Sequence, residues 1–386
     1  MNQSLREQSF ERILLIKPSA LGDVIHTVPV LAKLRARYPA ARIDWLLNPA
    51  IAGLIGGHPA LSNVIPFERS VYVRAWRSWF AAKGLGKLLT TIRRNRYDLV
   101  IDLHGQFRSA LLALASGAPT RIGFDRPQQA RSASDRQLIA GAYVHGWTGA
   151  REGAWMAYTH RIPIPALDVH AVDRYLWLAP ILGLDDGPPD FSLQPSLKEE
   201  HRADALIERH GLAGKPLAVL VPGTLWETKH WHVEGFAEVA RHLTRTGRAV
   251  ALAGSLAEQA RCQAVAALCP GVRDLSGQTT LSDLAALIRR AEICVTNDSG
   301  SMHLTVALGR PVVCVFGPTD PVWIGPYGRP HAVVRAGLPC SPCYLRRLQA
   351  CPNGHACMKE VTGAMVIERM EEVLAGERRP LASRVA

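Results

Sequence analysis

The sequence predicts an α/β protein built from two doubly wound domains, each a parallel sheet wrapped by helices. Its 386 residues correspond to two domains at roughly 150 residues per domain, each large enough to bury a core of its own. Short β-rich runs alternate with helical patterns along the whole chain, an order typical of parallel sheets with helical crossovers. Residues 183–195 are rich in Pro, Gly and Asp and interrupt both patterns, so we expect a linker there.

Individual strands are expected where short apolar runs occur. They lie at 12–17, 42–47, 64–67 and 98–103 in the first half, and at 217–221, 249–253, 293–296 and 312–316 in the second. Two such domains joined by a linker leave a cleft between them. Ligands of open parallel sheets bind at the carboxyl ends of the strands, so we expect the ligand-binding and catalytic residues in the loops that follow these runs.

The end of the chain carries one more helical pattern. Apolar residues recur there with the spacing of a helix that buries one face, at Val366, Ile367, Met370, Val373 and Leu374. We expect this last segment, residues 361–386, to pack back on the first domain. The two domains themselves are expected at 1–185 and 196–360.

Composition limits the class of protein. With 48% hydrophobic and 20% charged residues and a mean hydropathy of +0.03, the chain is globular rather than a disordered charged tail. Its longest apolar runs, such as 312–316, are far shorter than the ~20 residues of a membrane span, and the N-terminus lacks the apolar stretch of a signal peptide. We therefore expect a cytoplasmic protein.

The formal net charge of +12 favours an anionic partner, which could be nucleic acid, a phosphorylated substrate or the acidic face of a membrane. Basic residues concentrate between positions 69 and 96, where Trp76, Trp79 and Phe80 are interleaved and no Asp or Glu occurs. A solvated helix face usually mixes both signs, so this stretch favours nucleic acid or a membrane surface. Its cations are Arg69, Arg74, Arg77, Lys83, Lys87, Arg93, Arg94 and Arg96.

The loop after the first strand is a candidate anion site. It reads Pro-Ser-Ala-Leu-Gly-Asp at 18–23, and a helix follows from about Val24. Small residues let backbone N–H groups approach a ligand, and a helix N-terminus favours negative charge. The loop lacks the G-x-G-x-x-G fingerprint, so it does not indicate a dinucleotide. Asp23 either caps the helix, a contribution of about 1 kcal/mol, or faces the cleft as a general base.

Two loops of the second half have the same organisation. The strand at 217–221 leads into PGTLWETKHW, in which Lys229 can supply a point charge to a phosphate and Thr224 a hydroxyl. The alternative is a solvated lysine beside two core tryptophans. The strand at 293–296 leads into NDSGSMH, where Asp298 and Ser299 precede a helix that can hold the hydroxyls and phosphates of a nucleotide sugar. Here the alternative is that Asp298 simply caps the helix.

Eight cysteines are too few for a disulfide scaffold. Four are placed singly in apolar stretches and are expected to be core thiols: Cys262, Cys269, Cys294 and Cys314. The other four are crowded into one segment with the spacing C-x2-C-x7-C-x5-C, at Cys340, Cys343, Cys351 and Cys357. In a reducing compartment this spacing resembles a metal site more than a pair of disulfides, and free thiols are the alternative.

Taken together, these loops resemble those of glycosyltransferase family 9, the lipopolysaccharide heptosyltransferases. The matching segments are ILLIKPSALGDVIHTVPVLAKLR at 13–35, YDLVIDLHGQFRSALL at 97–112, ETKHW at 227–231, TNDSGSMHLTVALGRPVVCVFGPTDP at 296–321 and the terminal cysteine segment. Several motifs in the right order over nearly the whole chain make the resemblance specific. VYVRAWRSWF at 71–80, GFD at 123–125 and AREG at 150–153 look more like the first heptosyltransferase than the second.

The resemblance implies a GT-B fold, with two Rossmann-like domains facing a central cleft. It implies an inverting transfer of heptose from ADP-heptose, held by the C-terminal domain, to the Kdo of a lipid A precursor, held by the N-terminal domain at the inner membrane. No metal or other cofactor is implied for the chemistry. Asp23 matches the general base and Lys229 the lysine that stabilises the leaving diphosphate.

The other site residues carried over by the resemblance fall into two groups. The donor group is Thr224, Lys229, Glu258, Asp298, Ser299, Gly300 and His303, of which Glu258 is matched through a gapped comparison. The acceptor group is Arg74, Arg77, Gln106, Arg108 and Arg151. Nucleic acid thereby becomes the least expected of the three anionic partners.

The sequence departs from the family in two places. Residues 127–148 form an insertion on the acceptor side, so the acceptor could be a protein instead of a lipid. The four clustered cysteines resemble a segment of other branches, including heptosyltransferases that modify protein, and suggest a structural Zn or Fe. From another class of function, a non-catalytic binder of nucleic acid or anionic lipid on the same fold would use the basic stretch.

Overall fold

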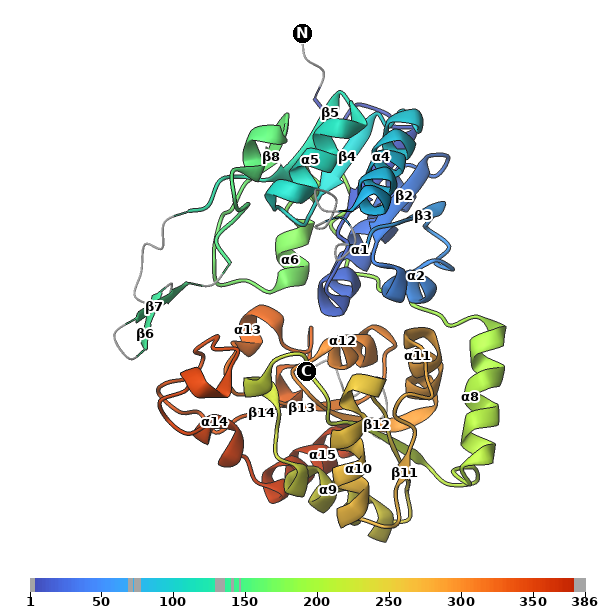
Figure 1. Cartoon of the computed structure of the whole chain (residues 1–386), viewed down its shortest axis with the longest axis vertical. Helices are drawn as coiled ribbons and strands as arrows, with labels where there is room; N and C mark the ends of the chain where they lie inside the picture. Colours follow the sequence, from blue (N-terminus) through green and yellow to red (C-terminus); the bar gives the residue numbers. More distant parts are fainter. Residues whose placement is uncertain are drawn as a thin grey trace. The chain divides into compact units, whose positions relative to one another are not determined.

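The computed structural model describes residues 4–68, 72, 78–128, 136–139, 142–145 and 147–377. The chain forms two compact units (Figure 1). The first comprises Met1–Arg136 and His145–Ser192, and the second comprises Leu193–Ala386 together with Gln137–Val144. The main division therefore falls at position 192, inside the Pro/Gly/Asp-rich stretch at 183–195.

The first unit is built on a six-stranded parallel sheet with the strand order β3-β2-β1-β4-β5-β8. This is the order of a doubly wound Rossmann-like sheet, with the switch point between β1 and β4. The strands are β1 Arg12–Ile16, β2 Arg42–Leu47, β3 Asn63–Pro66, β4 Leu99–Asp102, β5 Thr120–Phe124 and β8 His160–Ile162. Four of them occupy runs that the sequence predicts, and β5 and β8 are additional.

Helices connect these strands. They are α1 Leu21–Arg37, α2 Pro49–Ile55, α4 Trp79–Arg94, α5 Phe107–Ser116, η1 Ala154–Ala157, α6 Ala171–Leu176 and α7 Ala179–Leu182. The apolar residues of β1 from Ile13 to Ile16 are fully buried, as expected for a parallel strand covered on both faces. Each long helix places one apolar side against the sheet, which leaves the loops at the strand ends free to carry polar residues.

The second unit repeats the architecture. Its parallel sheet has the order β11-β10-β9-β12-β13-β14, from β9 Leu217–Val221, β10 Ala249–Leu252, β11 Arg273–Asp274, β12 Ala291–Asn297, β13 Val312–Val315 and β14 Val333–Val334. The longer helices are α8 Leu197–Arg209, α9 Val233–Arg245, α10 Gln259–Leu268, α11 Leu281–Arg290, α12 Gly300–Ala307 and α15 Gly363–Glu377. Short helical turns are η2 Glu227–Lys229, η3 Leu256–Glu258, α13 Pro321–Ile324, η4 Pro330–Ala332, η5 Leu348–Ala350 and α14 Ala356–Lys359.

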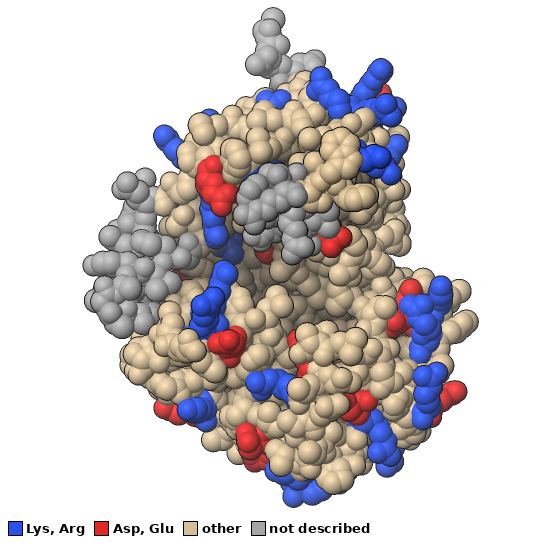
Figure 2. Space-filling model, viewed as in Figure 1, with Lys and Arg blue, Asp and Glu red and all other residues tan. Residues whose placement is uncertain are grey.

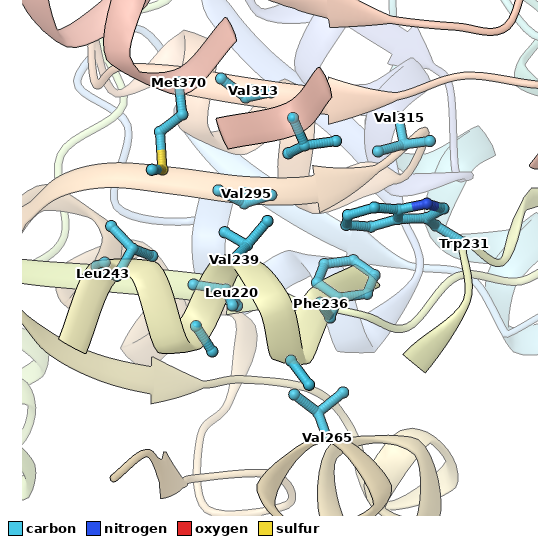
Figure 3. Packing of buried hydrophobic residues seen from close by; sticks show 14 of the residues in the cluster. Leu220, Trp231, Phe236, Val239, Leu243, Val265, Val295, Val313, Val315 and Met370 are labelled. Carbon is cyan, nitrogen blue, oxygen red and sulfur yellow. The ribbon is translucent and has the colours of Figure 1, made fainter. Parts of the chain in front are cut away.

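One large apolar core holds the second unit together (Figure 3). Trp231 and Phe236 are both fully buried, with ring centroids 4.9 Å apart, and the Trp231 indole N–H donates to the Val361 carbonyl at 2.8 Å. This bond ties the start of α9 to the segment that leads into α15. Two of the predicted core thiols, Cys262 and Cys269, lie in this cluster, and all four are buried and free.

The apolar side of the last helix is buried within the second unit. The apolar side of α15 includes Val366, Met370 and Leu374, and these residues belong to the core of the second unit. They pack on α9 and β13 of the same unit. The helical spacing correctly predicts a buried face, but spacing carries no information about which neighbour covers that face. Within the insertion at 127–148, the strands β6 Arg136–Ile139 and β7 Ala142–His145 pair with each other as a separate two-stranded sheet.

Candidate active site

Asp23 lies in the first turn of α1, directly after β1, and its two carboxylate oxygens have different partners. Oδ2 accepts the Ala20 backbone N–H at 3.3 Å, as a capping carboxylate does. Oδ1 accepts the Tyr175 hydroxyl at 2.7 Å and lies 3.4 Å from Lys17 Nζ. The side chain remains 42% exposed. Capping and facing an incoming ligand are therefore compatible for this residue, because different oxygens serve the two purposes.

The neighbours of Asp23 keep it ionised. Burial works to raise the pKa of Asp23, but Lys17, the Tyr175 hydroxyl and the Ala20 N–H oppose it, and the resulting pKa lies below the ordinary value. Burial lowers the pKa of Lys17, and the nearby Asp23 partly offsets this effect. The Lys17 ammonium also donates to the Leu103 carbonyl at 3.1 Å and lies 4.8 Å from the centre of the Tyr175 ring. At neutral pH this arrangement presents a carboxylate able to accept a proton.

A pocket of about 60 Å³ opens at the carboxyl end of the same sheet. Two of the expected acceptor residues line it, and Arg108 Nη2 donates to Gln106 Oε1 at 2.7 Å. The full lining is Ile16, Pro18, Ser19, Asn48, Phe67, His104, Gln106, Arg108, Ser109 and Leu112. Pro18 and Ser19, from the loop that leads to Asp23, thus line the same pocket as Gln106 and Arg108.

Asp102 holds the loop that carries these two residues. Its carboxylate is fully buried and accepts the N–H groups of His104 at 2.9 Å and Gly105 at 3.1 Å, and the Tyr158 hydroxyl at 2.8 Å. His104 is half-buried, and its partial burial, followed by the charge of Lys17, lowers its pKa to about 3. A neutral imidazole therefore faces the pocket over the whole physiological range.

The structure describes only one of the three other residues expected in the acceptor group, Arg151. Arg151 is held beside the same loop, because its backbone N–H donates to the Gly105 carbonyl at 2.7 Å. Arg74 and Arg77 lie outside the described residues. Sequence reasoning missed Lys17 and His104, although both lie inside matching motifs, and it missed Tyr175, which comes from α6 and has no motif of its own.

In the second unit, Lys229 and Asp298 form a buried ion pair. Lys229 Nζ lies 2.6 Å from Asp298 Oδ2, and the Thr319 hydroxyl donates to the same oxygen at 2.5 Å. Lys229 is only 9% exposed, so the alternative of a solvated lysine is wrong. The N-cap of α12 is Ser299, so the alternative in which Asp298 merely caps that helix is also wrong. The structure uses Asp298 to orient the lysine.

Other donor-group residues gather around this pair. The Thr224 hydroxyl donates to the Asp298 carbonyl at 3.1 Å, which joins the loop after β9 to the loop after β12. Ser299 Oγ lies 2.6 Å from Ser301 Oγ across the first turn of α12, which begins at Gly300. His303 is buried one turn further along. The N–H groups of this first turn are the part of the helix suited to an anion.

Glu258 reaches the same loops from η3. Its Oε2 accepts both the backbone N–H of Ser255 at 2.7 Å and the Ser255 hydroxyl at 2.8 Å. A Cβ at Gly223 would lie 2.2 Å from Glu258 Oε1, so glycine is what allows this carboxylate to lie against the loop that carries Thr224. The structure thus brings together all the expected donor-group residues that follow β9, β10 and β12.

The clustered cysteines do not support the expected structural metal. All four are free, and nowhere in the described ranges do three or more His, Cys, Asp or Glu side chains gather in a way that could hold a metal ion. Cys357 packs into the apolar core beside Met358, and burial raises its pKa to about 12. Burial also raises the pKa of Cys343.

Comparison with known proteins agrees with these motifs. The sequence model of the protein family "Glycosyltransferase family 9 (heptosyltransferase)" matches residues 85–139 and 125–352 of this chain. Lipopolysaccharide heptosyltransferase 1 of Pseudomonas aeruginosa is 33% identical over 337 residues, which cover 86% of each chain. The chain belongs to glycosyltransferase family 9. The protein is a family 9 heptosyltransferase, as the loop motifs predict.

Relatives within family 9 also bear on the subtype. Lipopolysaccharide heptosyltransferase 1 of Escherichia coli is 31% identical over 336 residues, covering 84% of this chain and 93% of the relative. Heptosyltransferase 2 of the same organism is 28% identical over 384 residues. The expected similarity to the first heptosyltransferase is confirmed.

Solved family 9 structures confirm the GT-B fold. E. coli heptosyltransferase WaaC with ADP-2-deoxy-2-fluoro heptose superposes with a TM-score of 0.70 at 26% identity, covering 94% of this chain and 99% of that one. E. coli ADP-heptose lps heptosyltransferase II gives a TM-score of 0.69 at 25% identity, covering 95% of this chain and 100% of that one. The two six-stranded parallel sheets described above are the two Rossmann-like sheets of this fold.

Proposed function

We propose that this heptosyltransferase moves heptose from ADP-heptose to the Kdo of a lipid A precursor, with inversion at the anomeric carbon and with Asp23 as general base. The relatives named as lipopolysaccharide heptosyltransferase 1 support the acceptor class, and the WaaC complex with an ADP-heptose analogue supports the donor. The observation that supports this mechanism most directly is the state of the Asp23 carboxylate. It is ionised, partly exposed and oriented by Tyr175 and Lys17.

In the proposed step, Asp23 takes the proton from the attacking acceptor hydroxyl. The acceptor oxygen forms a bond to the anomeric carbon while the bond from that carbon to the ADP oxygen breaks from the opposite side. Negative charge then develops on the departing diphosphate. Lys229 and the free N–H groups at the start of α12 are the groups suited to stabilise that charge, because they are held in place before the reaction begins.

A lipid acceptor requires contact with a membrane surface, and two helices of the first unit have suitable side chains. Trp79 and Phe80 at the start of α4 are 77% and 85% exposed. The outer side of the neighbouring α5 exposes Phe107, Leu111 and Leu114. Apolar side chains exposed at this density on two packed helices favour an apolar partner.

Charge on α4 identifies the kind of surface. Between Trp79 and Arg94 the helix carries four exposed cations and no Asp or Glu, namely Lys83, Lys87, Arg93 and Arg94. Figure 2 shows mostly uncharged atoms over this part of the first unit, with Lys and Arg side chains at its margin. Exposed aromatic residues combined with cations suit an anionic phospholipid surface. Among the described residues no helix is long and apolar enough to cross a membrane.

The base assignment is tested by Asp23→Asn. We expect turnover to fall at least about 100-fold while ADP-heptose still binds, because a positioned general base contributes roughly 10²–10⁴-fold. The matched control is Asp186→Asn, which changes an exposed carboxylate of the same unit and should leave turnover unchanged. Near-normal turnover of Asp23→Asn would end the assignment.

The membrane proposal is tested with vesicles. Phe80→Glu should weaken co-sedimentation with phosphatidylglycerol-containing vesicles, and Leu197→Glu, on a residue that is 77% exposed in the second unit, should not. Binding of wild-type protein to neutral and anionic vesicles alike, or loss with both variants, would contradict a specific role for α4.

A protein acceptor is the second candidate, favoured by the insertion at 127–148 and its paired strands β6 and β7. The deciding experiment incubates the enzyme with ADP-heptose and either Kdo-lipid A or total cell protein, followed by mass spectrometry. Addition of one heptose to the lipid supports the proposed acceptor, and addition to protein alone would replace it.

A further inference from the structure

The segment at 338–359 carries the four clustered cysteines, and its contacts suggest a purpose other than metal binding. One part of it is tied to the loop after β13. The backbone N–H groups of Cys343 and Tyr344 both donate to the Pro318 carbonyl, at 2.9 and 2.7 Å. The Ser341 hydroxyl donates to the Gly317 carbonyl. This is the loop whose Thr319 donates to Asp298, so the segment supports one side of the ion pair.

The next part of the segment is tied to the loop of Lys229. The Thr228 hydroxyl donates to the Leu345 carbonyl at 2.5 Å, and the Leu348 N–H donates to Glu227 Oε2 at 3.1 Å. His355 Nε2 lies 2.6 Å from the Thr228 carbonyl. The segment therefore bridges the two loops that hold Lys229 and Asp298, and it fixes its own residues between 341 and 348 beside them.

This bridge places a second cation against the tryptophan ring that Lys229 also contacts. The guanidinium carbon of Arg346 lies 4.6 Å from the centre of the Trp226 ring, and Lys229 Nζ lies 4.4 Å from the centre of the same ring. Such distances are those of cation–π contacts, which hold the two charges on one aromatic side chain. Arg346 is exposed, so its guanidinium is accessible to a ligand.

The negative charges around Lys229 indicate that a diphosphate would need a further positive charge, which Arg346 could supply. Lys229 is already paired with Asp298, which offsets part of the attraction that the ammonium exerts on a diphosphate. Glu258, which lies against the neighbouring glycine loop, adds a further negative charge. A dianionic ligand needs additional positive charge, and a guanidinium can bind phosphate oxygens through two N–H groups at once.

We propose that the cysteine-bearing segment is a strap that builds the donor site, and that its Arg346 is a second diphosphate-binding cation beside Lys229. The proposal rests on the proposed donor, a nucleoside-diphosphate sugar. Its ligand class is the diphosphate group, not the base or the sugar.

The test compares binding of ADP and adenosine to full-length protein by isothermal titration calorimetry. Arg346→Ala should raise the Kd of ADP by about 10-fold, the effect of losing one charge-assisted contact, and leave the Kd of adenosine unchanged. Arg346→Lys, which retains the charge, should lose less. The salt dependence of ADP binding should also become shallower in Arg346→Ala, because one charge fewer is screened.

The matched control is Arg347→Ala, an exposed arginine at the adjacent position. It should bind ADP as the wild type does. Equal ADP affinity in Arg346→Ala and wild type would overturn the proposal, and so would equal weakening of ADP and adenosine, since that would indicate a contact with the base. If wild-type protein bound no ADP at all, the proposed donor would fail instead, so the two failures are distinguishable.

Discussion

The ammonium of Lys229 lies 2.6 Å from the carboxylate of Asp298, and both side chains are buried at the carboxyl ends of neighbouring strands of the second sheet. Thr319 donates to the same carboxylate and so fixes its position. A lysine oriented in this way needs no rearrangement when charge develops on a leaving group, which is the condition for effective electrostatic stabilisation.

Lys229→Ala is expected to lower the rate of glycosyl transfer by about 100-fold, a typical cost of removing one pre-positioned stabilising group. It should also weaken ADP binding, measured by calorimetry alongside single-turnover kinetics. Lys215→Ala, at an exposed position of the same unit, is the control and should change neither quantity. If both quantities were unchanged in Lys229→Ala, the ion pair would serve only to hold the two loops together.

The pH profile of turnover should report the environment of Asp23. Its pKa is lowered, so the base is present above that pKa and activity should fall only below the usual Asp value of about 3.9. Lys17→Met removes the main contribution that opposes burial, so it should raise the pKa of Asp23 and move the acidic limb of kcat to higher pH.

Two further variants check this interpretation. Tyr175→Phe removes the hydroxyl that donates to Asp23, so it should move the limb in the same direction. Lys198→Met changes an exposed lysine of the second unit and should leave the profile as it is. An acidic limb that stays in place in Lys17→Met would show that Asp23 is not the group being titrated.

His104 predicts a pH dependence of stability. Its folded pKa is about 3, whereas an unfolded histidine titrates near 6.5, so between these values the unfolded chain binds the extra proton. The neutral state of His104 therefore stabilises the fold fully above about pH 6.5. Below that pH the free energy of unfolding falls by up to about 1.4 kcal/mol for each pH unit, until the folded pKa is reached.

Denaturant unfolding of wild type and His104→Gln between pH 7 and pH 5 measures this contribution. The variant should lose less stability on acidification than the wild type, and His160→Gln, at an exposed position of the same unit, should follow the wild type. Parallel curves for wild type and His104→Gln would contradict the lowered pKa of this imidazole.

Met370→Ala tests where the last helix packs. Met370 is fully buried in the core of the second unit, so the variant should lower the free energy of unfolding of that unit by about 2–5 kcal/mol. Glu368→Ala, on the exposed side of α15, should cost little. Hydrogen exchange in α9 and β13 should rise in Met370→Ala. If protection were lost only in the first unit, α15 would have to pack there instead.

Much of the fold could be predicted from the sequence because its signals are local. Uninterrupted apolar runs predict eight of the strands, and the polar residues that follow them place Asp23, Lys229 and Asp298 at the carboxyl ends of the sheets. The short strands β11 and β14 have two residues each, too few to show a pattern. The motif spacing was also sufficient to indicate family 9, because that information lies in consecutive residues.

Only the tertiary structure decided which distant groups meet. By itself the sequence determined the strands, the loops and the residue types in them. It could not determine that Tyr175 donates to Asp23 or that Thr319 donates to Asp298. Nor could it determine that Arg346 and Lys229 contact the same tryptophan ring, or that α15 packs beside α9. Each contact joins segments brought together by the packing of a whole sheet and its helices. Such packing depends on shape and burial summed over many residues, and no local spacing records it.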